Sequence, residues 1–537
     1  MKKTLAGLIA WVLLSVLVPA HAQVTTAQYD NARTGANINE TILTPQSVSP
    51  QQFGKLFSLP VDGSVYAQPL YLPGVEIPGK GKHNVVYIAT EHDSVYAFDA
   101  DGKSLEPLWH VSFIRPEDGI TTVPAKDVGR PCLSPEVGIT ATPVIDLSTG
   151  TLYVVARTKE RQGLFEKDEY VQHLHALAVT TGAQKFGGPV VIHASVPGSG
   201  TGSTQGKLDF DPLRHNPRTA LLLANGTVFI GWGSSCDARP YHGWVMAYDA
   251  QSLKQKGVFN VSPDAGEGGI WQSDAGLAAD AEGNVYVVTG NGKFDAAANG
   301  RNFGNSVLKL GLDEQGLAVR DYFTPFNHDD LNTNDEDLGS GGPVLLPEPA
   351  AREKKSLPRR LLAMAGKGGT LYLIDREKMG KFHPGDDSHA VHTLTTDFMG
   401  FGAPATWNGN LYHLFGNHVL SHYMIEKGKL VRKATAQGPK FMVPGATPTI
   451  SANGTKNGIV WVAEWRGWKP TDPPSVLHAY DASNVAHELF NSEQKGERDR
   501  LSRILRFAVP TVANGRVYVG GAKQVDVFGP LSLAARK

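Results

Sequence analysis

The stretch VVYIATEHDSVYAFDAD, residues 85 to 101, has a second version later in the chain, LLAMAGKGGTLYLIDRE, at residues 361 to 377. Aligned without a gap, the two place apolar residues at most of the same positions. Both break in the middle on small or polar residues, and both close around an aspartate, Asp99 or Asp375. Each is typical of two β-strands joined by a tight turn, because β-branched and aromatic residues fill pleated strands and Gly, Asn and Asp accept the positive φ of hairpin turns.

These two stretches belong to a set of eight repeats. Each repeat opens on a Pro or a small residue followed by an apolar run, a turn and further β runs, and the repeats begin at residues 66, 139, 218, 274, 340, 401, 445 and 507. Units of about 50 to 75 residues with three or four strands cannot bury a hydrophobic face alone, so they stack side by side. We therefore predict an all-β fold, a single β-propeller of eight four-stranded blades, with seven blades as the alternative if one repeat is misread.

The two ends of the repeat region complement each other. The last repeat ends in VYVGGAKQVDVFGPL without an outer strand, whereas FGKLFSLPV, residues 53 to 61, precedes the first repeat without a hairpin partner. We predict that residues 53 to 61 complete the last blade and close the ring, which removes an exposed strand edge. The predicted organisation is a signal peptide at 1–22, an extended arm at 23–52, the propeller at 53–530 and a tail at 531–537.

The first residues have the pattern of a secretory signal. Lys2 and Lys3 precede an apolar run from Leu5 to Val18, and Ala20-His21-Ala22 fits a cleavage site after Ala22. A membrane anchor is the alternative, but the run is shorter than the roughly 20 residues that span a bilayer. We expect an exported protein, periplasmic or secreted, without a membrane span.

Charge and cysteine content narrow the function classes. Lys and Arg number 51 against 52 for Asp and Glu, which disfavours nucleic acid as a partner because a basic face should dominate there. The two cysteines, Cys132 and Cys236, predict a disulfide in an exported protein, with free thiols or a metal site as alternatives. Such a bridge would stabilise the fold by about 4 to 5 kcal/mol in the chain-entropy model. We expect a monomer.

Several repeats end in the pattern of VYAFDAD, VMAYDAQS and LHAYDASN, and several open their first strand on Pro. In these features residues 53 to 530 resemble the quinoprotein alcohol dehydrogenase-like superfamily of eight-bladed propellers. YDNARTGANINET near the start also resembles uncharacterised secreted bacterial members. The resemblance implies the fold and two classes of function, since some members are enzymes that use pyrroloquinoline quinone (PQQ) and calcium and others are not enzymes. The adjacent cysteines and regularly spaced blade tryptophans of the alcohol-oxidising members are absent.

Places where a repeat departs from the common pattern are candidate sites. In the first repeat, Glu91, His92 and Asp93 fill a turn that needs only Gly or Asn, so they could form a base or a metal site, or simply a solvated turn. In the fourth repeat, Trp271, Gln272 and Asp274 open the first strand, and Asn291 and Asn305 follow later. An aromatic ring beside amides and carboxylates suits a planar ligand or a sugar, and a buried Trp with capped loops is the alternative.

A third candidate lies in NHDDLNTNDEDLGSGG. Asp330, Asn332 and Asn334 alternate as in a calcium loop, but Asp335 and Gly341 break the EF-hand pattern. An irregular calcium site and an acidic surface loop are the two interpretations.

Together these features predict a protein that binds a small molecule, a glycan or a protein at the mouth of its central channel. The alternative is a PQQ- and calcium-dependent oxidoreductase acting on alcohols or sugars. A carbohydrate-active lyase or hydrolase that uses His92 and nearby acids is a further alternative, for which the sequence offers no motif.

Overall fold

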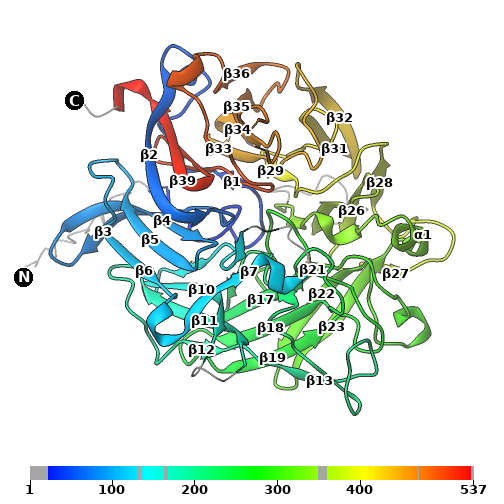
Figure 1. Ribbon diagram of the computed structural model, residues 1–537. Helices are drawn as coiled ribbons and strands as arrows, with labels where there is room; N and C mark the ends of the chain where they lie inside the picture. The colour runs from blue at the N-terminus through cyan, green and yellow to red at the C-terminus, as the bar shows by residue number, and fades with distance from the viewer. Residues whose placement is uncertain are drawn as a thin grey trace, which may run out of the picture.

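The computed structural model describes residues 22–129, 133, 135–161, 167–348, 360–469 and 471–533. Eight β-sheets are arranged around one axis as the blades of a propeller, and the chain runs round the ring from blade 1 to blade 8 (Figure 1). The predicted fold class and the count of eight blades are confirmed. Within the described part of the chain, no helix is both long and apolar enough to cross a membrane.

Four antiparallel strands form the frame of each blade. For each blade they are named in order from the channel outward. Blade 1 consists of β3 (Leu70–Ile77), β4 (Gly81–Thr90), β5 (Ser94–Asp99) and β6 (Trp109–Ser112). Blade 2 consists of β9 (Val144–Asp146), β10 (Thr151–Glu160), β11 (Glu169–Ala178) and β12 (Val190–Val191). Blade 3 consists of β16 (Leu222–Ala224), β17 (Thr227–Ser234), β18 (Trp244–Asp249) and β19 (Gln255–Asn260). Blade 4 consists of β20 (Ala278–Ala279), β21 (Val285–Val288), β22 (Val307–Asp313) and β23 (Gly316–Thr324).

The second half of the ring repeats this order. Blade 5 consists of β24 (Val344–Leu345), β25 (Leu361–Ala365), β26 (Thr370–Asp375) and β28 (His392–Thr395). Blade 6 consists of β29 (Ala405–Trp407), β30 (Asn410–His413), β31 (Ser421–Glu426) and β32 (Lys429–Thr435). Blade 7 consists of β33 (Thr449–Asn453), β34 (Lys456–Glu464), β35 (Val476–Asp481) and β36 (Glu488–Asn491). Blade 8 consists of β37 (Thr511–Ala513), β38 (Arg516–Gly520), β39 (Ala522–Pro530) and β2 (Phe53–Ser64).

A few elements lie outside this frame. They are β1 (Ala36–Asn37) beside β33, β7 (Ile120–Pro124) and β8 (Glu136–Val137) in blade 2, β15 (His215–Asn216) in blade 3, β27 (Lys381–Phe382) in blade 4, the hairpin of β13 (Ser195–Pro197) and β14 (Lys207–Asp209), and the one-and-a-half-turn helix α1 (His328–Thr333).

The ring closes as the sequence predicts. Strand β2 pairs antiparallel with β39, from Phe53 opposite Pro530 to Ser64 opposite Ala522, so the N-terminal strand is the outer strand of the last blade. Figure 1 shows the two strands side by side, one blue and one red. The closure joins the first blade to the last and leaves β39 without an open edge.

The hydrophobic core lies between the blades. Each apolar cluster is shared by neighbouring blades, for example the cluster of Val154, Leu177 and Ile145 in blade 2 with Val95 of blade 1 and Val527 of blade 8. The second strands are buried along most of their length because both faces of each sheet are covered, as in β10, where eight residues in succession are buried. Bulky Val, Ile, Leu and aromatic residues in these strands therefore hold the ring together.

The N-terminal arm lies across the channel, which the sequence did not predict. Residues 24 to 37 hydrogen-bond in turn to the inner edge of every blade, through Tyr71, Ile145, Leu221, Ala279, Leu345, Thr406, Ile450 and Val512. The edge of an inner strand has unpaired backbone groups, and the arm satisfies them. The arm therefore closes the channel with protein backbone below the ends of the inner strands.

Candidate functional site

The segments that lead into the inner strands form the mouth of the channel. The residues four positions before the first residue of each inner strand are Tyr66, Thr140, Arg218, Asp274, Ser340, Phe401, Gly445 and Phe507. These are the positions at which the sequence repeats begin, to within one residue. The architecture therefore places eight residues of seven types at equivalent positions around one axis, with Phe at two of these positions.

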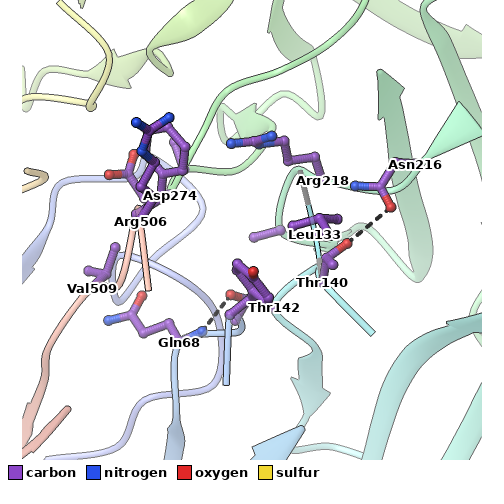
Figure 2. Close-up of a pocket in the computed structure, with 13 residues that line it drawn as sticks. Gln68, Leu133, Thr140, Thr142, Asn216, Arg218, Asp274, Arg506 and Val509 are labelled. Atoms are coloured by element: carbon purple, nitrogen blue, oxygen red, sulfur yellow. Dashed lines mark hydrogen bonds between the residues drawn. The ribbon is translucent and has the colours of Figure 1, made fainter. Parts of the chain in front are cut away.

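A cavity opens beside the part of this ring that belongs to blades 8, 1, 2, 3 and 4 (Figure 2). The space open to the centre of a water molecule is about 40 Å³, and about 520 Å³ lies between the lining atoms when the part open to solvent is counted. Its polar lining residues are Tyr66, Gln68, Thr140, Thr142, Asn216, Arg218, Asp274 and Arg506, and its apolar ones include Leu133, Phe507 and Val509.

Two arginines dominate the charge of the cavity. Arg218 extends from one wall toward Asp274 and Arg506 on the other (Figure 2). Among the residues that the structure describes, neither guanidinium lies within ion-pair distance of a carboxylate. Each instead lies over aromatic rings, Arg218 at 4.7 Å from the centre of Phe507 and Arg506 at 4.6 Å from the centre of Trp465. Burial lowers the pKa of both arginines, but they remain cationic because the ordinary value is so high.

Asp274 does not neutralise them. Neither of its side-chain oxygens is exposed to solvent, and neither has a hydrogen-bond partner in the described structure. Burial raises the pKa of Asp274 well above its usual range, although Arg218 and Thr447 partly oppose the effect. Asp274 therefore favours its protonated form more than an ordinary aspartate does, and it offsets less of the positive charge of the two arginines.

The floor of the cavity is tied to the N-terminal arm. The side-chain oxygen of Gln68 accepts the backbone N–H of Gln28 at 2.9 Å, and its amide nitrogen donates to the carbonyl of Pro510 at 3.2 Å. Thr142 Oγ1 accepts the backbone N–H of Gln68 at 2.8 Å. These contacts fix the bottom of the cavity, so a ligand enters from the mouth.

A second polar cluster, at the start of blades 4 and 5, contains the sequence candidates Trp271 and Asn291. Asp337 Oδ1 accepts two hydrogen bonds, from Trp271 Nε1 at 3.0 Å and from the backbone N–H of Asn291 at 2.8 Å. Lys367 Nζ lies 2.7 Å from Asp335 Oδ2 and 4.0 Å from Asp337 Oδ2. Only 14% of the Asp337 side chain is exposed, so one carboxylate oxygen is fixed and the other faces a lysine at a partly open position.

Burial raises the pKa of Asp337 to about 6, with the charge of Asp237 adding and that of Lys367 opposing. Asp237 also acts on Arg218, which lines the cavity. The cluster is continuous with the cavity through the short segment from Trp271 to Asp274. Burial therefore raises the pKa of both aspartates, to about 6 for Asp337 and well above the usual range for Asp274.

The other candidates of the fourth repeat are structural in their contacts. Gln272 donates from Nε2 to the Gly276 carbonyl at 2.7 Å and accepts the Val288 N–H at 3.0 Å. Asn305 donates to Asn291 Oδ1 at 3.0 Å and accepts the Leu338 N–H at 2.9 Å. Both amides therefore hold the loops that present Trp271, Asp274 and Asn291.

The turn of Glu91, His92 and Asp93 is divided between core and surface. Glu91 and Asp93 are buried, whereas the His92 ring is 39% exposed and bonds Glu136 Oε1 through Nδ1 at 2.7 Å. Burial, with the like charges of Glu136 and Asp93, raises the pKa of Glu91 to about 8. Burial also raises the pKa of Asp93 well above its usual range, although its Oδ1 accepts the Arg157 N–H at 3.1 Å. The turn is neither a solvated surface loop nor a convergent triad of side chains.

The candidate calcium residues fall on and beside helix α1. Asp330 and Asn334 are exposed, whereas Asn332 bonds Gly292 and Asn305 through its side chain. Residues two apart on a helix point to different sides, so the three do not converge. Within the described ranges, no group of three or more His, Cys, Asp or Glu side chains is arranged to hold a metal ion.

The predicted disulfide involves Cys132, and the predicted signal peptide covers residues 1 to 22. Cys132 and residues 1 to 21 lie outside the described residues, so both remain predictions.

Sequence reasoning missed Arg218, Arg506, Asp337 and Lys367. Two signals were available. Arg218 stands at the first position of the third repeat, and Lys367 stands at the repeat position of Glu91, where the pattern needs only a turn residue. Asp337 lies seven residues beyond Asp330, in the stretch that does not follow the EF-hand pattern.

Comparisons with known proteins identify the fold. No family model and no curated protein matches the sequence. A quinohemoprotein alcohol dehydrogenase from Pseudomonas putida has a TM-score of 0.60 at 15% identity over 96% of this chain and 81% of its own. The Comamonas testosteroni enzyme of that class has a TM-score of 0.59 at 16% identity over 97% and 82%, and a europium-containing methanol dehydrogenase has 0.58 at 12% over 95% and 98%. The fold is therefore that of the quinoprotein alcohol dehydrogenase propellers.

Proposed function

We propose that this protein is an oxidoreductase that holds a planar, carboxylate-bearing redox cofactor of the PQQ class at the mouth of its channel. One observation carries the proposal: an unpaired guanidinium, an aromatic face and the carboxyl of Asp274 line one cavity where the repeats begin, and Asp337 lies in the neighbouring cluster with Trp271. Buried charges in proteins are normally paired, so an unpaired cation in a cavity favours an anionic ligand. The fold shared with quinoprotein dehydrogenases supports the redox class.

The chemistry of the residues that line the cavity, rather than its volume, suits the organic cofactor. Arg218 would hold a carboxylate through its fork of N–H donors, and Phe507 lies against that guanidinium at 4.7 Å. The hydroxyl of Thr142 and the amide of Asn216 add polar contacts on the adjoining wall. When bound, such a quinone accepts a hydride, or two electrons and a proton, from the carbon that bears a substrate hydroxyl.

The cavity does not fit the calcium ion that the resemblance implies. Asp337 Oδ1 is occupied by two N–H donors, and the ammonium of Lys367 stands near Oδ2. Hard divalent cations need six to eight oxygens at short range, and the described residues of the cavity do not gather such a set. No step is derived through a metal.

Asp337 and Asp274 have different acid–base properties. Asp337 is held in place by two hydrogen bonds, and because its pKa is about 6 it is ionised at neutral pH. It takes the proton of a substrate hydroxyl as a general base, most effectively when its pKa lies near the working pH. Burial raises the pKa of Asp274, which favours the protonated form of this carboxyl beside Arg218. The arm excludes water from below.

The test combines binding and turnover. Purified protein is incubated with PQQ, with and without Ca²⁺, and bound quinone absorbance and dye reduction with primary alcohols and sugars are measured. We expect stoichiometric binding and dye reduction in both conditions. The variant Asp337→Asn should still bind PQQ but lose about 10²- to 10⁴-fold in turnover. Absence of PQQ binding at micromolar concentration would overturn the proposal.

A second candidate is a binding protein without catalysis. Two observations favour it. Asp337 Oδ1 already accepts two hydrogen bonds, and the described residues contain no group of three or more His, Cys, Asp or Glu side chains that could hold a metal ion. In that case the cavity would bind an anionic small molecule, or the mouth a glycan or protein. Stoichiometric binding of PQQ with no dye reduction, in wild type and Asp337→Asn alike, would support it.

A further inference from the structure

Arg506, which lines the cavity, packs against two tryptophans beside it. Trp465 and Trp468 lie in the loop between β34 and β35 of blade 7, and Arg506 leads into blade 8. The Arg506 guanidinium is 4.6 Å from the ring centre of Trp465 and 5.2 Å from that of Trp468. The two rings meet edge to face with their centres 5.1 Å apart. This group of three side chains is called the rim cluster below.

The rim cluster offers buried donors without acceptors. Trp465 is only 6% exposed, yet its Nε1 has no hydrogen-bond partner, and the same holds for Arg506 Nε. An unmade hydrogen bond at a buried donor costs about 1–3 kcal/mol, so two on adjacent side chains point to a missing acceptor. An anionic oxygen group satisfies both donors and the guanidinium charge at once.

The surroundings favour an anion rather than a neutral group. Arg218 lines the same cavity and repels Arg506, and burial raises the pKa of Asp274, which weakens the opposing negative charge. A positive cavity with low-dielectric walls concentrates anions. The loop is also preorganised, because Arg503 donates to the carbonyls of Trp468 at 2.8 Å and Lys469 at 2.6 Å.

The exposed indole ring of Trp468 offers a second surface for binding a ligand. Trp468 is 44% exposed, which makes it an open flat surface directly beside the donors. Sugar rings pack their C–H faces on such aromatic surfaces, and a carboxylate on that ring would reach the adjacent guanidinium.

We infer that the rim cluster binds the substrate, and that this substrate is a sugar acid, a ring with hydroxyl groups and one carboxylate. That the sugar acid is a substrate rests on the proposed function, but its binding to the rim cluster does not require the cofactor. Arg506 pairs with the carboxylate, Trp465 Nε1 donates to it, and Trp468 packs on the ring. Arg218, on the opposite wall, is left for the cofactor.

The test uses the full-length mature protein without cofactor. Tryptophan fluorescence and titration calorimetry are followed with D-glucuronate and with D-glucose, which differ only in the carboxylate. We expect glucuronate to quench fluorescence and to bind at least tenfold more tightly than glucose, with an affinity that falls as salt rises. Equal binding of the two sugars, or binding of neither, would overturn the inference.

Matched variants locate the effect. Arg506→Gln should lose at least tenfold in glucuronate affinity and leave glucose unchanged, and Arg506→Lys should recover part of the loss. Trp468→Phe should weaken both sugars and remove most of the quenching. Arg301→Gln, which removes an exposed arginine elsewhere, should leave both affinities as in wild type. If Arg301→Gln weakened glucuronate as much as Arg506→Gln, the effect would be one of net charge and the site would be refuted.

The outcomes separate this inference from the proposed function. Selective glucuronate binding without any PQQ-dependent dye reduction would refute the oxidoreductase and leave the sugar-acid site standing. PQQ-dependent oxidation of neutral alcohols, with no preference for glucuronate, would refute the site and leave the oxidoreductase standing.

Discussion

The floor of the channel contains a buried arginine and the mouth contains two half-buried arginines, and their hydrogen bonding is opposite. At the floor, Arg33 is wholly buried and donates to four acceptors, the carbonyls of Leu277, Ala27 and Leu221 and the hydroxyl of Thr26. At the mouth, Arg218 and Arg506 have aromatic neighbours and no carboxylate within ion-pair distance in the described structure. The same side chain is satisfied by the fold in one place and left unsatisfied in the other.

The difference separates architecture from function. Desolvating a guanidinium is costly, and at the floor that cost is offset by backbone acceptors from blades 3 and 4. At the mouth nothing in the described chain offsets it, which is the condition in which a ligand gains most from binding. We expect substitutions at the floor to lower stability and substitutions at the mouth to lower affinity.

The largest effect should come from the floor. Replacing Arg33 by Met keeps much of the volume but leaves three carbonyls and a hydroxyl without donors, so we expect a loss on the order of 5 kcal/mol in the free energy of unfolding. Chemical denaturation followed by fluorescence measures it. Arg301→Met, which breaks an exposed ion pair with Asp264, is the control and should cost less than about 1 kcal/mol. Equal losses of unfolding free energy in Arg33→Met and Arg301→Met would show that the buried arginine contributes no more to stability than an exposed one.

The next effect concerns a buried carboxyl beside the channel. The pKa of Glu91 is about 8 in the folded state against an ordinary 4.5, so the folded protein retains a proton that the unfolded chain loses. Stability from this group is therefore complete below pH 4.5, falls as the pH rises, and is lowest above pH 8. Glu91→Gln should match wild type at pH 5 and exceed it by on the order of 4 kcal/mol at pH 9.

Thermal and urea unfolding of both proteins across this pH range provide the measurement. A constant difference between Glu91→Gln and wild type from pH 5 to pH 9 would show that Glu91 ionises normally. It would also remove Glu91 from the set of groups that the fold keeps neutral.

The smallest effect on stability should come from the mouth. Arg218→Met removes an unpaired cation, so we expect the free energy of unfolding to change by less than about 1 kcal/mol. PQQ affinity should fall at least tenfold in the same variant, since one charge-assisted contact is lost. Calorimetry with PQQ, beside denaturation, checks both. A stability loss comparable to that of Arg33→Met would make Arg218 architectural.

Most of the fold could be predicted from the sequence, because turn residues and β-branched runs are local signals repeated eight times. Even the ring closure by Phe53–Ser64 followed from one unpaired strand at each end. The candidate site was predicted only in part. Trp271, Asp274 and Asn291 departed visibly from their repeat, but Asp337 and Lys367 are common surface residues whose roles arise only from their neighbours.

The sequence by itself determined the all-β class, the number of blades and the strand that closes the ring, since alternation and turn chemistry act over a few residues. Only the tertiary structure decided that the arm crosses the channel, that Asp337 accepts a hydrogen bond from Trp271 and that Arg218 and Arg506 line the same cavity. Those contacts join residues from dozens to hundreds of positions apart, and a pKa or an unpaired charge depends on everything packed around a group. No local pattern in the chain specifies that environment.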